Sequence, residues 1–163
     1  LAAPASATGL DRVRATLELG RAWAQAGATA LAFPAAGVID EGQEFRTLEP
    51  ATLEPDGAAG LLIAFAMMGR GSDGRTWVRT RGMSQFGLHD LCCSMPLLPQ
   101  MPTGMVENAQ QLFGSVVPFM IAMDRALEPR ERVKVGDATW RVADESALRT
   151  APPHYGTVRA PRR

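Results

Sequence analysis

Residues 75–95 constrain the fold more than any other stretch of this chain. Their first half alternates between two sets of side chains with a period of two, which is the pattern of a half-buried strand. One set is Thr76, Val78 and Thr80, and the other is Arg75, Trp77, Arg79 and Arg81. Residues 90–95 alternate again, so the stretch predicts two strands joined by a bend.

Two glycines define the bend. Gly82 and Gly87 bracket four residues, and glycine allows a chain to reverse sharply. If the bend projects from the edge of the sheet, Met83 and Phe86 cannot both face the core. We therefore expect Phe86 to pack inward and anchor the bend. The side chains expected at the surface beside it are Arg79, Arg81 and Gln85.

The first part of the chain predicts a helix followed by a strand. Thr8 precedes Asp11 by three residues, as in a helix N-cap with an acidic partner, and Gly27 suits the C-terminal end. The apolar residues at helical spacing between them are Leu10, Val13, Leu17, Leu19, Trp23 and Ala26. Residues 29–33 then form a short apolar segment that ends at a proline and predicts a strand.

The middle of the chain is less regular. Residues 35–55 lose any periodicity among glycines, prolines and acids, so we expect a long loop with a short helix at 47–53. Residues 60–68 are continuously apolar and too few for a typical helix, which predicts a central strand buried on both faces. Residues 69–74 are glycine-rich and predict a hairpin turn into the next strand.

A second helix and a hairpin are expected near the end. Thr103 can cap a helix that Pro118 should kink or divide and Pro129 should end, because proline lacks the N–H group and crowds the preceding turn. Residues 132–135 and 139–142 predict a closing hairpin. The element order describes one α+β domain over residues 1–150, a mostly antiparallel sheet with two main helices on one face, and a frayed C-terminal arm over 151–163.

Composition excludes several classes of partner. Basic and acidic residues balance at 17 each, so no net field attracts nucleic acid or an anionic membrane. No apolar run approaches the ~20 residues of a membrane span. Lys134 is the single lysine among many arginines, alanines and glycines, which suggests a GC-rich bacterial source. We expect no cofactor, and another protein as the partner.

The ends and the cysteines bear on the compartment. Residues 1–9 lack the basic and apolar regions of a signal peptide. Cys92 and Cys93 are adjacent, and neighbours rarely bridge each other, so no disulfide framework is predicted. The cytoplasm is therefore the expected location.

A glycine pattern in the chain resembles a nucleotide-binding fingerprint. Gly69, Gly71 and Gly74 match the spacing G-x-G-x-x-G. That fingerprint works by opening a helix whose N-terminus holds the pyrophosphate, whereas here a strand is expected to follow. The pattern therefore predicts a hairpin turn without a nucleotide.

The cysteines and histidines could serve a thiol nucleophile or a metal site. Cys92 or Cys93 with His89 would be a thiol nucleophile with its base, but alternate residues of a strand point to opposite faces, so His89 and Cys92 diverge. Cys93 shares the face of His89 but lies further along the strand. A buried structural cysteine is the favoured interpretation. No metal site is predicted, because two histidines and two cysteines lack the spacing of ligand pairs.

The arginine-rich strand face admits two interpretations. Trp77 with Arg79 and Arg81 could bind anions or stacked bases, since these side chains serve such contacts. Alternatively, the arginines pair with acids across the strand and their stems cover the tryptophan. The neutral net charge favours the second interpretation. As a surface for another protein, the predicted residues are Trp77, Arg79, Arg81 and Gln85.

Residues 80–91, TRGMSQFGLHDL, carry a family resemblance. They resemble the central signature of a mainly bacterial family, domain of unknown function 4261, which has the form T-x-G-[LM]-x-x-[FL]-G-x-P-[DE]-[IL] between two strands. The chain departs from it by placing His89 where proline is usual and Cys92 where an acid is common. The resemblance implies a single α+β unit and no particular activity.

These observations lead to two functional hypotheses. The first is a non-enzymatic protein-binding or interaction domain of bacterial type, of an immunity or accessory kind. The alternative is a small thiol-dependent hydrolase that uses Cys92 or Cys93 with His89. Whether the chain is an enzyme is left open at this point, with the non-enzymatic hypothesis preferred.

Overall fold

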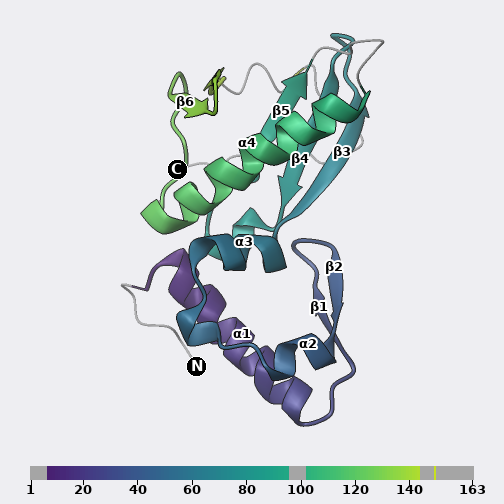
Figure 1. The fold of residues 1–163 in the computed structure, drawn as a ribbon, viewed down its shortest axis with the longest axis vertical. Helices are drawn as coiled ribbons and strands as arrows, with labels where there is room; N and C mark the ends of the chain where they lie inside the picture. Colours follow the sequence, from purple (N-terminus) through teal and green to yellow (C-terminus); the bar gives the residue numbers. More distant parts are fainter. Residues whose placement is uncertain (1–6, 96–101, 144–148, 150–163) are drawn as a thin grey trace.

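A computed structural model describes residues 7–95, 102–143 and 149 (Figure 1). The elements are α1 (Gly9–Gln25), β1 (Ala30–Phe33), β2 (Val38–Glu41), α2 (Gly42–Arg46), the 3-10 helix η1 (Pro50–Thr52), α3 (Pro55–Leu62), β3 (Ala64–Arg70), β4 (Thr76–Arg81), the 3-10 helix η2 (Met83–Phe86), β5 (Cys92–Met95), α4 (Pro102–Met123), β6 (Arg132–Val135) and β7 (Ala138–Arg141). The predicted arm over 151–163 lies outside the described residues.

Helix α1 forms where the caps predict it. The Thr8 hydroxyl accepts from the Asp11 N–H, and the Asp11 carboxylate accepts from the Thr8 N–H, so both ends of a capping box are present. Gly27, just past the C-cap, adopts a φ of +106°, as a helix-terminating glycine does. The buried face consists of Gly9, Val13, Leu17, Gly20 and Ala24. Leu19 and Trp23, which the spacing assigned to the helix's apolar set, instead point outward.

The predicted loop over residues 35–55 is wrong in its first half, whereas the short helix predicted at 47–53 is present as η1. The chain pairs β2 with β1 in an antiparallel hairpin, then forms α2 and η1. These elements are short, so periodicity could not reveal them. Phe45 of α2 is fully buried and stacks on Phe33 of β1, with ring centroids 5.6 Å apart.

The interpretation of residues 60–68 as one strand is also wrong. Residues up to Leu62 complete α3, which begins with Pro55 at a position where the missing N–H costs nothing. Strand β3 starts at Ala64 and lies at the edge of a three-stranded sheet of order β3-β4-β5. Phe65 is partly exposed, so the strand is not buried on both faces. A continuous apolar run cannot distinguish a buried strand from a buried helix end.

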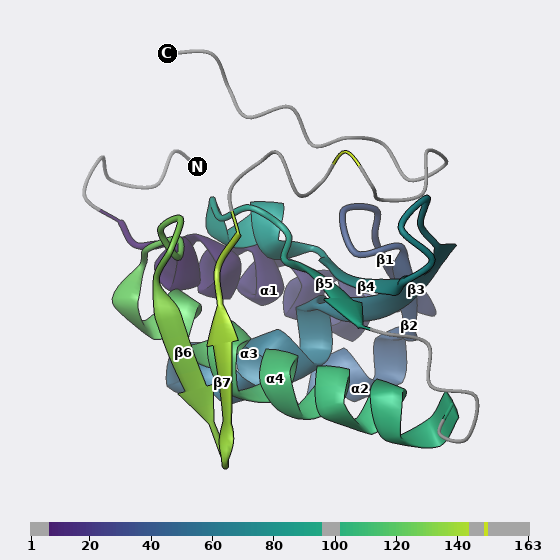
Figure 2. The same ribbon diagram turned by 90° about the horizontal axis from the view of Figure 1, so that it is seen from above.

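The β3-β4-β5 sheet is antiparallel and β4 is its central strand. Arg70 pairs with Thr76 across the glycine turn, so the predicted hairpin is confirmed, with a bulge between Met67 and Gly69. Helix α4 crosses one face of this sheet (Figures 1 and 2). Phe113 of α4 stacks on Phe65 of β3 at 5.6 Å between centroids.

The end of α4 differs from the expectation. Pro118 lies inside the helix without dividing it, and the helix ends at Met123 rather than at Pro129. Asp124 follows with a φ of +48°, a conformation that terminates the helix. The hairpin of β6 and β7 then forms within one residue of its predicted bounds.

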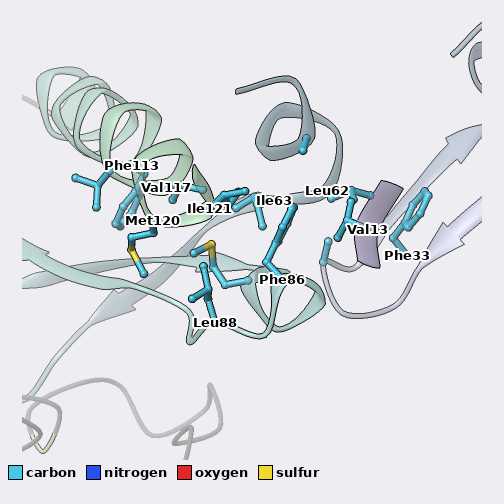
Figure 3. Packing of buried hydrophobic residues seen from close by; sticks show 14 of the residues in the cluster. Val13, Phe33, Leu62, Ile63, Phe86, Leu88, Phe113, Val117, Met120 and Ile121 are labelled. Atoms are coloured by element: carbon cyan, nitrogen blue, oxygen red, sulfur yellow. The ribbon is translucent and has the colours of Figure 1, made fainter. Parts of the chain in front are cut away.

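Except for Met68 and Trp77, the buried apolar side chains of the described residues form one contiguous cluster. It draws on α1, β1, α2, α3, β4, the bend, β5, α4 and β6. Figure 3 shows part of it, with the Phe86 ring pointing from the bend toward Leu62 and Ile63. The fold is α+β with antiparallel pairing, as predicted. In the described part of the chain, however, the strands are divided among three small sheets instead of one, because α2, η1 and α3 separate β2 from β3.

Candidate functional site

The bend between β4 and β5 was the first candidate site. Gly82 and Gly87 adopt φ values of +111° and +75°, so both predicted glycine positions need the left-handed region. A Cβ on Gly82 would also overlap the carbonyl oxygen of Leu62. Phe86 packs inward as predicted, but Met83 is fully buried as well. The bend therefore does not project from the sheet: it folds against the ends of α1 and α3.

Asp90 holds the bend in place. Its Oδ1 accepts from the Met83 N–H at 3.2 Å and from the Thr80 hydroxyl at 3.3 Å. Its Oδ2 lies 3.6 Å from a guanidinium nitrogen of Arg79. The Thr80 hydroxyl in turn accepts from the Leu91 N–H at 2.8 Å. The side chains of Arg79 and Asp90 are only 16% and 15% exposed, so this network lies mostly inside the protein.

The remaining polar residues of the bend also make intramolecular contacts. Gln85 donates its amide N–H to the carbonyl oxygen of Leu62 at 3.2 Å, where α3 ends. The guanidinium of Arg81 lies over Gly37, in the turn between β1 and β2. Both side chains therefore tie the bend to neighbouring elements while staying partly exposed.

Trp77 is not a surface residue. It is 3% exposed, and its indole N–H has no hydrogen-bond partner among the described residues. Its burial argues against a place for Trp77 at a binding surface, and the ion pair between Arg79 and Asp90 is of the kind that the second interpretation of this face predicted. Of the four side chains predicted to bind a partner, Trp77 is buried, while Arg79, Arg81 and Gln85 are partly exposed. Their binding role stays a prediction.

The thiols do not form a nucleophile–base pair. Cys93 is buried, and its burial raises the pKa of the thiol to about 11. Loss of hydration also raises the pKa of the exposed Cys92, by more than the nearby Arg79 lowers it. Within the described residues, no hydrogen bond joins His89 to either sulfur. A raised pKa disfavours the thiolate, which is the reactive form.

The other chemistries that the sequence raised find no support in the geometry. The glycine pattern at 69–74 joins two strands, and its Gly74 N–H donates to the Gly71 carbonyl inside the turn. Among the residues that the structure describes, no three His, Cys, Asp or Glu side chains gather as a metal site. None of the described helices is long and apolar enough to cross a membrane.

Sequence reasoning missed an exposed apolar face on α1. Leu19 is 51% exposed and Trp23 is 56% exposed, one helical turn apart. Three exposed alanines, Ala15, Ala22 and Ala26, extend the same side of the helix. We call these five residues the α1 apolar stripe. The spacing could have indicated this face, because Leu19 and Trp23 do not share the side of the helix that Val13, Leu17 and Ala24 bury.

Four of the five charged residues of α1 lie to one side of this stripe. The fifth, Arg12, precedes Ala15 by three residues and donates to the carbonyl oxygens of Ala7 and Phe86. Glu18 pairs with Arg21 at 2.8 Å and Asp11 with Arg14 at 3.6 Å. Arg21 also reaches Glu49, and Arg14 donates to the Leu53 carbonyl. The stripe itself therefore carries no charge between Ala15 and Ala26.

Comparisons with known proteins return no relatives. No family model, no curated protein and no solved structure matches this chain.

Proposed function

We propose that this chain is a non-enzymatic protein-interaction domain that contacts its partner through the α1 apolar stripe. The observation that carries the proposal is the exposure of Leu19 and Trp23 side by side on one helix. Large aromatic side chains are enriched at the centre of protein interfaces, where they supply much of the binding energy. A bacterial, cytoplasmic protein of the immunity or accessory kind, related to the domain of unknown function 4261, belongs to the same proposal.

The polar bend supports the proposal indirectly. Asp90, Arg79 and Gln85 are occupied by intramolecular hydrogen bonds and an ion pair, so this network stabilises the fold. A catalytic group must instead be available to a substrate. The polar groups of the bend already bond within the protein. Burial of the uncharged α1 apolar stripe against a partner therefore offers a larger gain in free energy than burial of the bend.

Site-specific photo-crosslinking tests this proposal. A photoreactive benzoylphenylalanine replaces Trp23 in one variant and Gln25 in a control variant. Gln25 is an exposed residue of the same helix on its charged side. Irradiation of cells of the native host should give discrete protein adducts from position 23 and none from position 25. Equal labelling from both positions, or none from either, would contradict the proposal.

Alkylation kinetics test the alternative hydrolase. At neutral pH, iodoacetamide should modify Cys92 slowly and Cys93 more slowly still, because Cys93 is buried and its thiol pKa is about 11. The variants Cys92→Ser and Cys93→Ser assign each rate to its residue. Fast, stoichiometric alkylation that His89→Ala suppresses would favour the enzyme and count against the interaction domain.

A further inference from the structure

We propose that residues 144–163, here called the C-terminal segment, lie across the face of the β3-β4-β5 sheet opposite α4 and cover Trp77 and Met68. This face is distinct from the α1 apolar stripe, so the inference does not depend on the proposed function. It is carried by the burial of two side chains that none of the described helices and strands covers.

Trp77 and Met68 are buried outside the core. Trp77 is 3% exposed and Met68 is 6% exposed, yet neither belongs to the cluster that joins the sheet to α4. Val78, the next residue of β4, does belong to that cluster. Successive side chains of a strand point to opposite faces, so Trp77 points away from α4.

The neighbours of Trp77 within the sheet are too small to bury its ring. Gly69 lies opposite on β3 and Ser94 lies opposite on β5. The guanidinium of Arg75 donates to the Ser94 carbonyl oxygen at 3.0 Å, which draws it toward β5. The ion pair of Arg79 draws that guanidinium toward the bend. The face of the indole ring therefore needs a cover from outside the sheet.

The described elements do not supply this cover. In Figures 1 and 2, α4 lies on one face of the sheet, and none of the described helices or strands packs against the other. Helix α1 contacts the bend, and α3 contacts α4. Antiparallel sheets often leave such a face to solvent, where a tryptophan would be largely exposed. The low exposure of Trp77 therefore requires a further part of the chain.

The C-terminal segment has the length and the starting point to cover this face. Residues 96–101 must join β5 to α4 on the opposite face, and residues 1–6 precede a helix that contacts the bend, at the far end of β4 from Trp77. In Figure 2, β7 runs from the level of α4 toward the other side of the sheet, and the segment continues from there. An extended chain advances roughly 3.3 Å per residue, so the segment can easily cross three strands that lie about 4.8 Å apart.

The composition of the segment suits an aromatic sheet face. Its large apolar side chains are Leu148, Tyr155 and Val158. Pro152 and Pro153 favour an extended backbone without internal hydrogen bonds, and aromatic surfaces bind such segments. The indole N–H of Trp77, a donor only, has no partner among the described residues. We expect it to donate to a backbone carbonyl oxygen of the segment.

Photo-crosslinking from Cys92 tests this placement in the full chain. Cys92 is exposed, and its register with β4 puts it on the face of Trp77. In a Cys93→Ser variant, a benzophenone maleimide on Cys92 should give intrachain adducts within residues 144–163, mapped by peptide mass spectrometry. The control carries the same group on Ser115→Cys, with both native cysteines replaced by serine. Ser115 is exposed on α4, across the sheet, and should give no such adducts.

Acrylamide quenching gives an independent measure. Trp77 is the one tryptophan that remains after Trp23→Phe and Trp140→Phe, and the full chain should shield its fluorescence well. Replacement of the segment's three large apolar side chains by serine should raise the quenching constant severalfold, while the circular dichroism spectrum stays unchanged. Leu19→Ser, on the exposed side of α1, is the control and should leave the quenching constant as it is.

Three outcomes would overturn the inference. Adducts from Cys92 that fall only outside residues 144–163 contradict it, as does a complete lack of adducts. So does a folded triple-serine variant in which Trp77 is still shielded from acrylamide. If the triple-serine variant loses its circular dichroism spectrum, the adducts from Cys92 decide the question.

Discussion

Asp90 is the residue on which the conformation of the bend depends most. Its carboxylate accepts two hydrogen bonds and pairs with Arg79, and all three interactions are shielded from water. The strand pattern placed Arg79 and Trp77 on one face correctly, but it could not show what covers that face. Burial depends on contacts between distant parts of the chain, and a period of two carries no information about them.

We predict that Asp90→Asn destabilises the protein. The asparagine oxygen can keep the contacts to Thr80 and Met83, but its NH2 group would face the Arg79 guanidinium, which is also a donor. Loss of this pair in a mostly buried place should cost about 1–3 kcal/mol of unfolding free energy. Urea denaturation measures the change. Asp137→Asn, in the exposed turn between β6 and β7, should stay within about 0.5 kcal/mol. A fully stable Asp90→Asn variant would show that the ion pair contributes little.

At the scale of elements, the sequence predicted those with clear end signals. Helix α1, strand β4, the bend and the last hairpin each carry caps, alternation or glycines that local physics can interpret. Strand β2 and helix α2 carry none, and α3 was taken as part of a strand because its end and β3 form one apolar run. Packing of Phe45 against Phe33 stabilises α2, and this contact is visible only in three dimensions.

The junction between α1 and the bend yields a second prediction. Gly9 donates its N–H to the Asp124 carboxylate at 2.9 Å, and a Cβ on Gly9 would overlap the carbonyl oxygen of Phe86. Gly9→Ala should therefore push α1 away from the bend and destabilise the protein by about 1–3 kcal/mol. The matched control is Gly60→Ala in α3, where a Cβ meets open space. That change should stabilise the helix by about 0.5–1 kcal/mol. Equal unfolding free energies for the two variants would mean that α1 can move away from the bend without loss of stability.

At the scale of the whole molecule, composition and element order were enough to predict an α+β fold, but the division of the described strands into three small sheets was not predictable. Which strands pair depends on where helices interrupt the chain, and two of those helices gave no signal. The contiguous core explains how three separate sheets can still belong to one structure. Leu17 of α1, Val78 of β4 and Val117 of α4 belong to the same buried cluster. Residues in one cluster lose their contacts together, which favours a single unfolding transition.

We predict that the chain unfolds as one cooperative unit. Far-UV circular dichroism follows mainly α1 and α4, while a variant with Trp23→Phe and Trp140→Phe reports the sheet through the fluorescence of Trp77, which is buried in β4. The two urea midpoints should coincide. Leu17→Ala removes a fully buried side chain and should cost about 2–5 kcal/mol of unfolding free energy. Both urea midpoints should therefore fall together. Leu19→Ala, on the exposed side of the same helix, should change both very little. Separate midpoints, or a Leu17→Ala effect confined to circular dichroism, would mean that α1 unfolds independently of the sheet.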